Sequence, residues 1–553
     1  MNKLNNFLKN TPLIVLITVV ETSLLNETIE LPQNRIYKNL YLWALPRNSV
    51  RKVVIEYNDK KYIGNENDVV DKVISDLDVL NIPRTPLNCL TILKISEIDF
   101  DDSPVNRTEM IRRVLFLLFS IDDIPKYKTR PDLKDTEYIL GYFCELMLRE
   151  NNYYFTREYF LELLNNFCKE KEIDLDIHVI FDILFKNHII IMREQEFCFK
   201  FTYWILYFAA HRMHQNTEFS KFILEDTKYS SYPELIEFYT GIDRRRDDAL
   251  KILINDIKVI TNIVETKCGL PPEFNIYDTA QWKPAEAEIE KMQNEITDGV
   301  LNSNLPLTVK DQYADQSYNK ARPLVQSINS ILEEYSLLRL LKILQASAKA
   351  LRNSDYSSLE MRHELLQEIM KGWEQITKVI IILSPILAEQ RSANYQGISV
   401  SLIGNFSDTK EKRFNQILES IPQSMVIQYK DDLFSKKMGT LLYKHIDNET
   451  NQLIKHSLNL LLIQKRPKGW EKHIEEYIIS ENKNSFYLHG VYHRLRVEYQ
   501  YSIASKSTLN SLEKLIRMSV AKHELGLTKP TQKAIRTIDK KYGNIVPKRK
   551  DIE

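Results

Sequence analysis

Three consecutive arginines, Arg244, Arg245 and Arg246, lie between aspartates in the segment DRRRDD, residues 243–248. Clustered guanidinium groups can bind the carboxylates of an acidic partner, because each presents a planar fork of donors. Arginines flanked by aspartates can also form ion pairs with those aspartates on a solvated surface, which is the simpler interpretation. The three arginines are therefore candidate partner-binding residues, with a self-paired run as the alternative.

Two histidines, His211 and His214, stand three residues apart in HRMH and would lie on one face of a helix. A structural zinc ion needs four ligands, and no further cysteine or histidine pair lies nearby in the sequence. We therefore expect a solvated helix end and no metal site. The segment HGVYHRLRVEY, residues 489–499, mixes residues that could bind RNA, but an amphipathic helix with its polar residues outward explains it more simply.

No residue pattern in the chain predicts catalysis. The dipeptide Gly-Lys never occurs, so the phosphate-binding motif GxxxxGK[ST] is absent, and GxGxxG is absent as well. The chain has only 13 glycines in 553 residues, well below the average usage of about 7%. We find no Ser/His/Asp or Cys/His spacing and no carboxylate pair above chance. The sequence predicts no catalytic residues, no metal and no cofactor bound by this chain alone.

The composition predicts a protein with several packed cores and no global electrostatic field. Lysine plus arginine and aspartate plus glutamate balance at 75 each, so nothing draws the whole chain towards nucleic acid or anionic lipid. The five cysteines are far apart and form no CxxC pair. They are typical of reduced, packed thiols in a cytoplasmic protein.

The apolar segment NTPLIVLITVVE, Asn10–Glu21, is too short for a membrane span, which needs roughly 20 residues. The segment TSLLNETIELP follows it without a small-x-small cleavage site, so a signal peptide is disfavoured. Thr11 can cap a helix and Pro12 suits its first turn. We expect a buried helix here and no membrane association.

Residues 1–125 are predicted to form a helical domain. Apolar residues at helical spacing predict a helix over Asp68–Leu80, and Ser103 or Asn106 can cap another that runs to Phe119. A short strand pair is expected within RKVVIEYNDKKYIG, Arg51–Gly64.

Residues 126–215 are predicted to form a winged-helix domain. Two short apolar alternations, HIIIM and FCFKF, follow three helices and are joined by the turn REQE. The third helix carries more acids than bases and would repel DNA phosphates, so we expect a scaffolding winged helix. The three helices are predicted over Asp135–Glu150, Thr156–Lys171 and Asp176–Asn187.

The remainder is predicted to be helical, with a connector over 216–290 and an α-helical sensor or interaction region over 291–553. Long helices are expected at Arg322–Leu351 and Leu359–Gln390, and the more polar Leu270–Glu288 is the expected linker. The basic tail Lys529–Lys550 could contact nucleic acid, but a solvated, partly disordered end is favoured. The fold class is therefore mainly α.

Three parts of the chain resemble, in the same order, the region of NACHT-like STAND NTPases that follows the nucleotide-binding core. One of the three consists of residues 82–111 and 217–244, which resemble segments of large bacterial proteins of this class. The first match is the family's "tPl.l" step followed by "lP..r..LY", carried here by Thr11, Pro12, Leu13, Leu31, Pro32, Arg35, Tyr37, Leu40 and Tyr41. The second is the end of the winged helix, "F.F.H....EyFaA", carried by Phe197, Phe199, Phe208, Ala209 and Ala210.

The resemblance implies a weak nucleotide contact at Pro12, because the matching proline of the family packs near the adenine. A helix-N1 proline in a core is the alternative. In many relatives a winged-helix histidine touches the nucleotide phosphate, but Phe201 stands at that position and cannot donate a hydrogen bond. His188 or Lys200 could replace it, although surface positions suit both better.

The resemblance also implies a function. The family's P-loop and strand core would lie before Met1, so this chain would be a separate subunit or a split or truncated product. It would be the sensor portion of a switch in bacterial antiphage defence, with ATP or ADP bound by a partner NTPase core. The trigger would be a phage protein or nucleic acid, and oligomerisation would follow. A helical scaffold or nucleic-acid-associated subunit without nucleotide linkage is the alternative.

Overall fold

The computed structural model describes most of the chain. Pro12 and the segment Asn10–Glu21 lie outside the described residues, as does the first part of the helix expected from Arg322. The described residues are 25–26, 44–79, 84–97, 104–120, 131–193, 195–270, 274–305, 310, 336–395, 398–402, 406–502, 504–526, 529–542 and 545–548.

The N-terminal helices correct one prediction. The strand pair expected over Arg51–Gly64 is wrong, because a helix covers most of that segment. Val50 and Val54, one helical turn apart, are fully buried, whereas Ile55 is 40% exposed. Helical spacing thus outweighs the β-propensity of the branched side chains. The helices are α2 (Arg47–Asn58), α3 (Glu66–Val79), α4 (Pro86–Ser96) and α5 (Arg107–Ser120).

Three helices and a two-stranded antiparallel hairpin follow in the predicted order. Thr156 caps the second helix, because its side chain accepts a hydrogen bond from the Tyr159 amide. Asp176 caps the third helix in the same way, by accepting from the Val179 amide. The elements are confirmed, while their assignment to the winged-helix class stays a prediction. They are α6 (Leu133–Glu150), α7 (Arg157–Glu170), α8 (Ile177–Lys186), β2 (Ile190–Arg193), β3 (Glu196–Phe199) and then α9 (Thr202–Gln215).

An aromatic core fixes the hairpin against these helices. The Phe143 ring lies 4.9 Å from both Phe155 and Phe160, and Phe181 lies 5.1 Å from Phe197 of β3. Phe155 and Phe197 also exchange both backbone hydrogen bonds, at 3.0 and 2.8 Å. The hairpin therefore has one position relative to the helices that precede it.

The rest of the described chain is helical, which confirms the mainly α fold. The helix expected over Leu359–Gln390 is found with those bounds. The elements are α10 (Thr217–Leu224), η1 (Glu225–Ser231), α11 (Pro233–Ile242), α12 (Asp247–Cys268), α13 (Glu286–Leu301), α15 (Ser336–Asn353), α16 (Leu359–Gln390), α17 (Lys410–Leu433), η4 (Lys436–Met438), α18 (Gly439–Asn448), α19 (Gln452–Lys465), α20 (Trp470–Ser480), α21 (Phe486–Tyr501), α22 (Lys506–Leu525) and α23 (Gln532–Tyr542).

A small sheet, which the sequence patterns did not predict, interrupts the helices. Strands β4 (Ser392–Tyr395) and β5 (Ile398–Ser401) form an antiparallel hairpin, and β1 (Leu25–Asn26) pairs antiparallel with β5. Arg391, in the left-handed conformation with φ 63°, ends α16 and redirects the chain.

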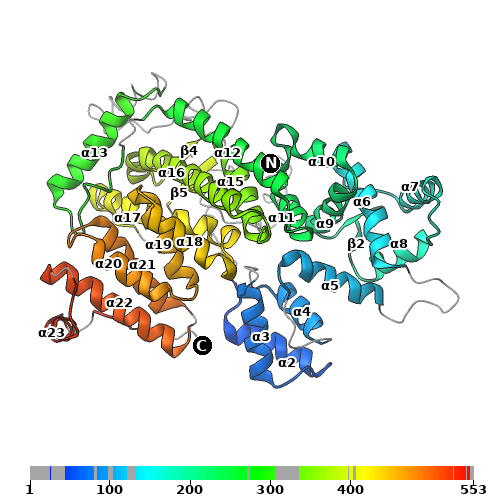
Figure 1. Ribbon diagram of the computed structural model, residues 1–553, viewed down its shortest axis with the longest axis horizontal. Helices are drawn as coiled ribbons and strands as arrows, with labels where there is room; N and C mark the ends of the chain where they lie inside the picture. The colour runs from blue at the N-terminus through cyan, green and yellow to red at the C-terminus, as the bar shows by residue number, and fades with distance from the viewer. Residues whose placement is uncertain are drawn as a thin grey trace, which may run out of the picture.

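Helix α11 lies between the N-terminal helices, which precede it in the chain, and the helices from α15 onward, which are called the C-terminal array below. It packs against α5 and α9 on one side and against α15 on the other. In Figure 1 it lies between the blue and cyan N-terminal elements and the yellow-green helices of the C-terminal array. Relative movement of the two parts would therefore change the packing of α11, and also that of η1 against α15.

The segment expected to be a loose linker, Leu270–Glu288, is described at residue 270 and from residue 274 onward, is non-helical from residue 274 to the start of α13, and is well anchored. The Tyr277 hydroxyl donates to the Leu418 carbonyl at 3.1 Å, and the Trp282 amide donates to Asn484 at 2.8 Å. Tyr277 and Trp282 are both buried. The segment thus braces the C-terminal helices.

The five cysteines are buried and none forms a disulfide bond, as predicted. Within the described part of the chain, no helix combines the length and apolarity that crossing a bilayer requires.

Candidate functional site

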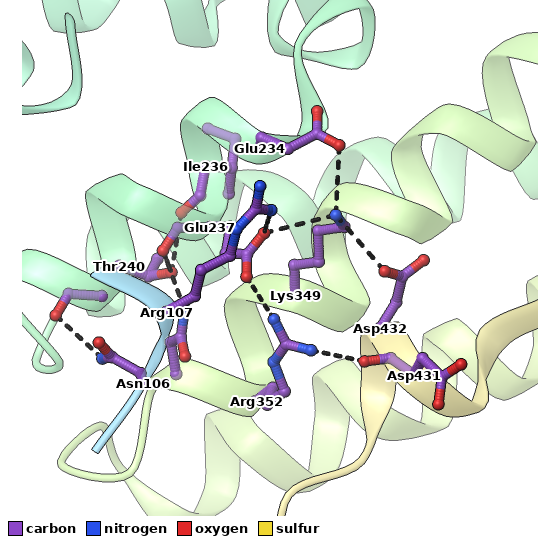
Figure 2. A network of polar contacts seen from close by, with 12 residues as sticks. Asn106, Arg107, Glu234, Ile236, Glu237, Thr240, Lys349, Arg352, Asp431 and Asp432 are labelled. Carbon is purple, nitrogen blue, oxygen red and sulfur yellow. Dashed lines mark hydrogen bonds and ion pairs between the residues drawn. The ribbon is translucent and has the colours of Figure 1, made fainter. Parts of the chain in front are cut away.

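Glu237 lies at the centre of a buried ionic network where α11 meets α15 (Figure 2). Its side chain is 1% exposed. Arg107 of α5 lies 3.3 Å from Oε2, and Lys349 of α15 lies 3.4 Å from the same oxygen. Arg352 of α15 donates to Oε1. One carboxylate therefore binds cations from two other helices.

Lys349 extends the network to α17. Its ammonium nitrogen lies 3.4 Å from Glu234, 3.4 Å from Glu237 and 3.5 Å from Asp432. Its side chain is only 8% exposed. Because α5, α11, α15 and α17 each supply a member, the network connects the N-terminal helices to the C-terminal array.

The electrostatics keep the central groups charged. Burial alone would raise the pKa of Glu237, but Lys349, Arg352 and Arg107 outweigh it and lower that pKa to about 2. Burial would lower the pKa of Lys349, yet the surrounding carboxylates raise it. Burial raises the pKa of Asp432 despite the attraction of Lys349. Removing one member would leave its partners charged in the interior.

Close backbone packing accompanies the network. The Asn106 amide group donates to the Gly241 carbonyl at 3.2 Å, and Asn353 donates to the Glu237 carbonyl at 2.9 Å. A Cβ atom at Gly241 would lie 2.1 Å from Thr108 Oγ1, far inside contact distance. Glycine at this position therefore allows the start of α5 to lie directly on the end of α11.

A polar cleft of about 450 Å³ opens beside this junction. The Tyr207 hydroxyl of α9 donates to Glu137 Oε1 of α6 at 2.6 Å, and His211 Nε2 lies 3.6 Å from the same oxygen. The cleft is lined by Val105, Asn106, Thr108, Glu109, Arg112, Lys134, Glu137, Tyr207, His211, Gln215, Gly241, Ile242 and Arg244.

The cleft presents a neutral imidazole and the buried carboxyl group of Glu137 beneath a basic rim. Burial lowers the pKa of His211 to about 3, so its imidazole is neutral, and burial raises the pKa of Glu137 although Tyr207 lowers it in part. Within the described residues, Thr108 Oγ1 and His211 Nε2 are buried without a hydrogen-bond partner. Arg112 and Lys134 are exposed at the rim. This arrangement can bind a polar ligand.

The structure divides the arginine run between internal and external positions. Arg244 pairs with Asp355 and lies 4.3 Å from the Tyr356 ring centroid. Arg246 pairs with Asp248 at 2.5 Å and lies 4.4 Å from the ring of Tyr239. Arg245, 75% exposed, pairs with Asp243 at 3.2 Å and is the arginine of the three that faces solvent. Partner binding by the run stays a prediction.

The expected solvated end at HRMH is wrong. The His214 ring contacts the Tyr239 carbonyl at 2.8 Å, and burial lowers the pKa of His214 to about 4. The cause is tertiary, because α9 packs against α11, whose Tyr239 contacts His214, and against α6, whose Glu137 lies near His211. Among the described residues, no group of three or more His, Cys, Asp or Glu side chains could hold a metal ion.

The positions considered for nucleotide or DNA contact take structural roles. Phe201 stacks on Tyr203 at 5.4 Å, and Lys200 lies 5.4 Å from the Phe201 ring. On the third helix, Asp176 is the N-cap and Asp182 pairs with Arg157 at 3.2 Å. These contacts explain the acidic residues without a nucleic-acid partner.

The two segments considered for RNA or nucleic acid are packed more tightly than expected. Arg494 of α21 is buried and donates to Gln423 at 2.7 Å, so the expectation of outward polar residues is wrong there. In the basic tail, Ile535 and Ile538 of α23 are buried, and Tyr542 donates to Glu524 at 2.7 Å. The described part of that tail therefore contains a packed helix, while its basic residues Lys533, Arg536 and Lys540 are exposed to solvent.

Glu237 and Lys349, the central members of the network, were not predicted from the sequence. A faint signal existed, since both lie within otherwise apolar runs, LIEFY and ASAKAL. A lone charge in an apolar run indicates a buried partner without identifying it. Comparison of the sequence with models of known protein families and with curated proteins found no match to either.

Proposed function

We propose that this chain is the regulatory and sensing portion of a STAND-type signalling system in bacterial antiphage defence. It would act in the cytoplasm by binding and oligomerisation, and an NTPase core outside this chain would bind ATP or ADP. The observation that carries the proposal is the ionic network around Glu237. It ties the N-terminal helices that resemble the family to the C-terminal array through one set of contacts.

A switch needs an element with two arrangements and a ligand that favours one of them. Charged contacts suit this role, because a small displacement of Lys349 separates it from three carboxylates together. The polar cleft beside the network, between α5, α6 and α9, is where a bound ligand could change the position of α5 on α11. A phage protein or nucleic acid bound to the C-terminal array would act on the same junction.

Co-purification with a partner NTPase, in ADP and in ATP, tests the proposal. The expected result is complex formation that depends on the nucleotide, with no hydrolysis by the isolated chain. Binding that is the same in both nucleotides would favour the helical scaffold instead. Nucleotide hydrolysis by the isolated chain would overturn the assignment as a non-enzymatic module.

The Glu237→Gln variant tests the role of the network. It keeps the shape of the side chain and removes the charge that Lys349, Arg352 and Arg107 share. We expect it to alter the nucleotide dependence of the complex. The matched control is Glu364→Gln, which removes a carboxylate from an exposed pair with Lys258 on α12.

A further inference from the structure

A second cleft, of about 550 Å³, lies in the C-terminal array and is not part of the Glu237 junction. It is formed by the segment before α13 together with α17, α21, α22 and α23. Its lining is rich in aromatic rings and includes two carboxylates: Trp282, Lys283, Pro284, Asn415, Glu419, His489, Tyr492, Val520, His523, Glu524, Tyr542 and Ile545.

The aromatic wall is built around Trp282. The His523 ring stacks on the indole at 4.2 Å with an interplanar angle of 14°, and Tyr492 and His489 lie at 5.0 and 5.2 Å. The Trp282 amide is fixed by its hydrogen bond to the Asn484 carbonyl at 2.8 Å. These rings pack on one another and all line the cleft.

Glu419 supplies a carboxylate whose hydrogen-bond donor, among the described residues, is a neutral amide group. It accepts a hydrogen bond from Asn415 at 2.8 Å, and its side chain is 30% exposed. The basic group that the structure pairs with it is His489, at 4.0 Å, whose pKa burial lowers to about 4. In the described part of the chain, Glu419 forms no ion pair with a lysine or arginine. Burial accordingly raises the pKa of Glu419.

We propose that this cleft binds a guanidinium group, from an arginine side chain of a partner protein or from a free arginine-like molecule. A guanidinium ion is planar, stacks on aromatic faces and binds carboxylates through parallel donors. The cleft supplies an aromatic wall and the Glu419 carboxylate, with Glu524 as a second acid on its lining. Its volume admits an arginine side chain with part of its backbone. The proposal does not depend on the proposed function.

Calorimetric titration of the full chain with two pairs of probes tests the proposal. The first pair is N-acetyl-arginine amide and N-acetyl-citrulline amide, which differ in charge but hardly in shape. The second pair is a Gly/Ser-rich nonapeptide that carries one arginine or one citrulline. We expect each arginine probe to bind at least tenfold more tightly than its citrulline counterpart. A tighter peptide would indicate a protein partner, and equal affinities a free small molecule.

The Glu419→Gln variant should weaken arginine binding about tenfold or more while leaving thermal unfolding nearly unchanged. Glu411→Gln, which removes the same charge from the exposed first turn of α17, is the control and should bind as the unaltered chain does. Trp282→Phe should also weaken binding, because phenylalanine offers a smaller face. Citrulline probes that bind equally well, absence of binding by both arginine probes, or an unchanged affinity in Glu419→Gln would overturn the proposal.

Discussion

Glu237 of α11 and Lys349 of α15 form a buried ion pair, with Oε2 and Nζ 3.4 Å apart. Their side chains are 1% and 8% exposed, so water can solvate neither ion if the other is removed. The pair joins α11 to α15 at the junction of the N-terminal helices with the C-terminal array. Its energetic role is therefore tested by removing one member at a time.

Lys349→Met should lower the free energy of unfolding by about 3 kcal/mol, because it leaves Glu237, Glu234 and Asp432 without their shared cation. Equilibrium urea unfolding followed by circular dichroism measures the change. The matched control is Lys342→Met on the same helix, where the lysine is only half-buried and lies outside the network. Equal losses in the two variants would show that the network adds nothing to stability.

Gly241→Ala should destabilise the junction of α5 and α11 by about 2 kcal/mol, since its Cβ would overlap Thr108 Oγ1. Thermal unfolding would report the loss. Gly64→Ala is the control, because its Cβ would make only an ordinary contact at 3.6 Å with Val69. If both variants have the same melting temperature, the close approach of α5 to Gly241 does not contribute to stability.

Acid should destabilise the protein partly through His456, which is fully buried and contacts the Tyr477 hydroxyl at 3.2 Å. Burial lowers the pKa of His456 to about 3, whereas the unfolded chain has a pKa near its ordinary value of 6.5. Below pH 6.5 His456 binds a proton in the unfolded chain, whereas it stays neutral in the folded chain. The contribution of His456 to the free energy of unfolding is therefore fully present above pH 6.5. It falls by up to about 1.4 kcal/mol per pH unit as the pH decreases towards 3.

Unfolding free energies measured between pH 7 and pH 5 would show this slope. The His456→Leu variant should have a shallower slope than the unaltered chain, whatever its stability at pH 7. His178→Leu, at an exposed position, should keep the original slope. Equal slopes for all three proteins would contradict the assignment of this pH dependence to His456.

Substitutions in the arginine run should separate structure from partner binding. Arg244→Ala should cost about 1–2 kcal/mol of unfolding free energy, because the guanidinium pairs with Asp355 and stacks on Tyr356. Arg245→Ala should leave stability within about 0.5 kcal/mol, since that side chain is 75% exposed. A partner-binding assay on Arg245→Ala then tests the predicted acidic partner. Unchanged binding would remove Arg245 from the interface.

Local patterns predicted many of the helices well. The helix Leu359–Gln390 and the helices α6, α7 and α8 follow from apolar spacing and capping residues such as Thr156, which act within a few residues. Helix α2 was mistaken for strands because its branched residues favour both states locally, and burial of Val50 and Val54 decides between them. The hairpin β4–β5 was missed because its pairing follows from how the long helix α16 ends.

The candidate sites were much less predictable. Whether HRMH faces water depends on α11, which covers it from outside its own segment. Arg245 and Arg244 are adjacent in the sequence, yet one faces solvent and the other is largely buried against Asp355. Trp282 and Glu419 are far apart in the chain and line one cleft. None of these relations has a local signature.

The sequence by itself determined the helical class, the absence of disulfide bonds among the five cysteines and the order of helices and hairpin over residues 133–199, because each depends on spacing, capping and composition within short segments. Only the tertiary structure decided that Glu237, Lys349 and Arg107 share one interior site and that aromatic rings gather around Trp282. Burial and Coulomb attraction act between groups more than a hundred residues apart. They come into effect only after the helices have packed.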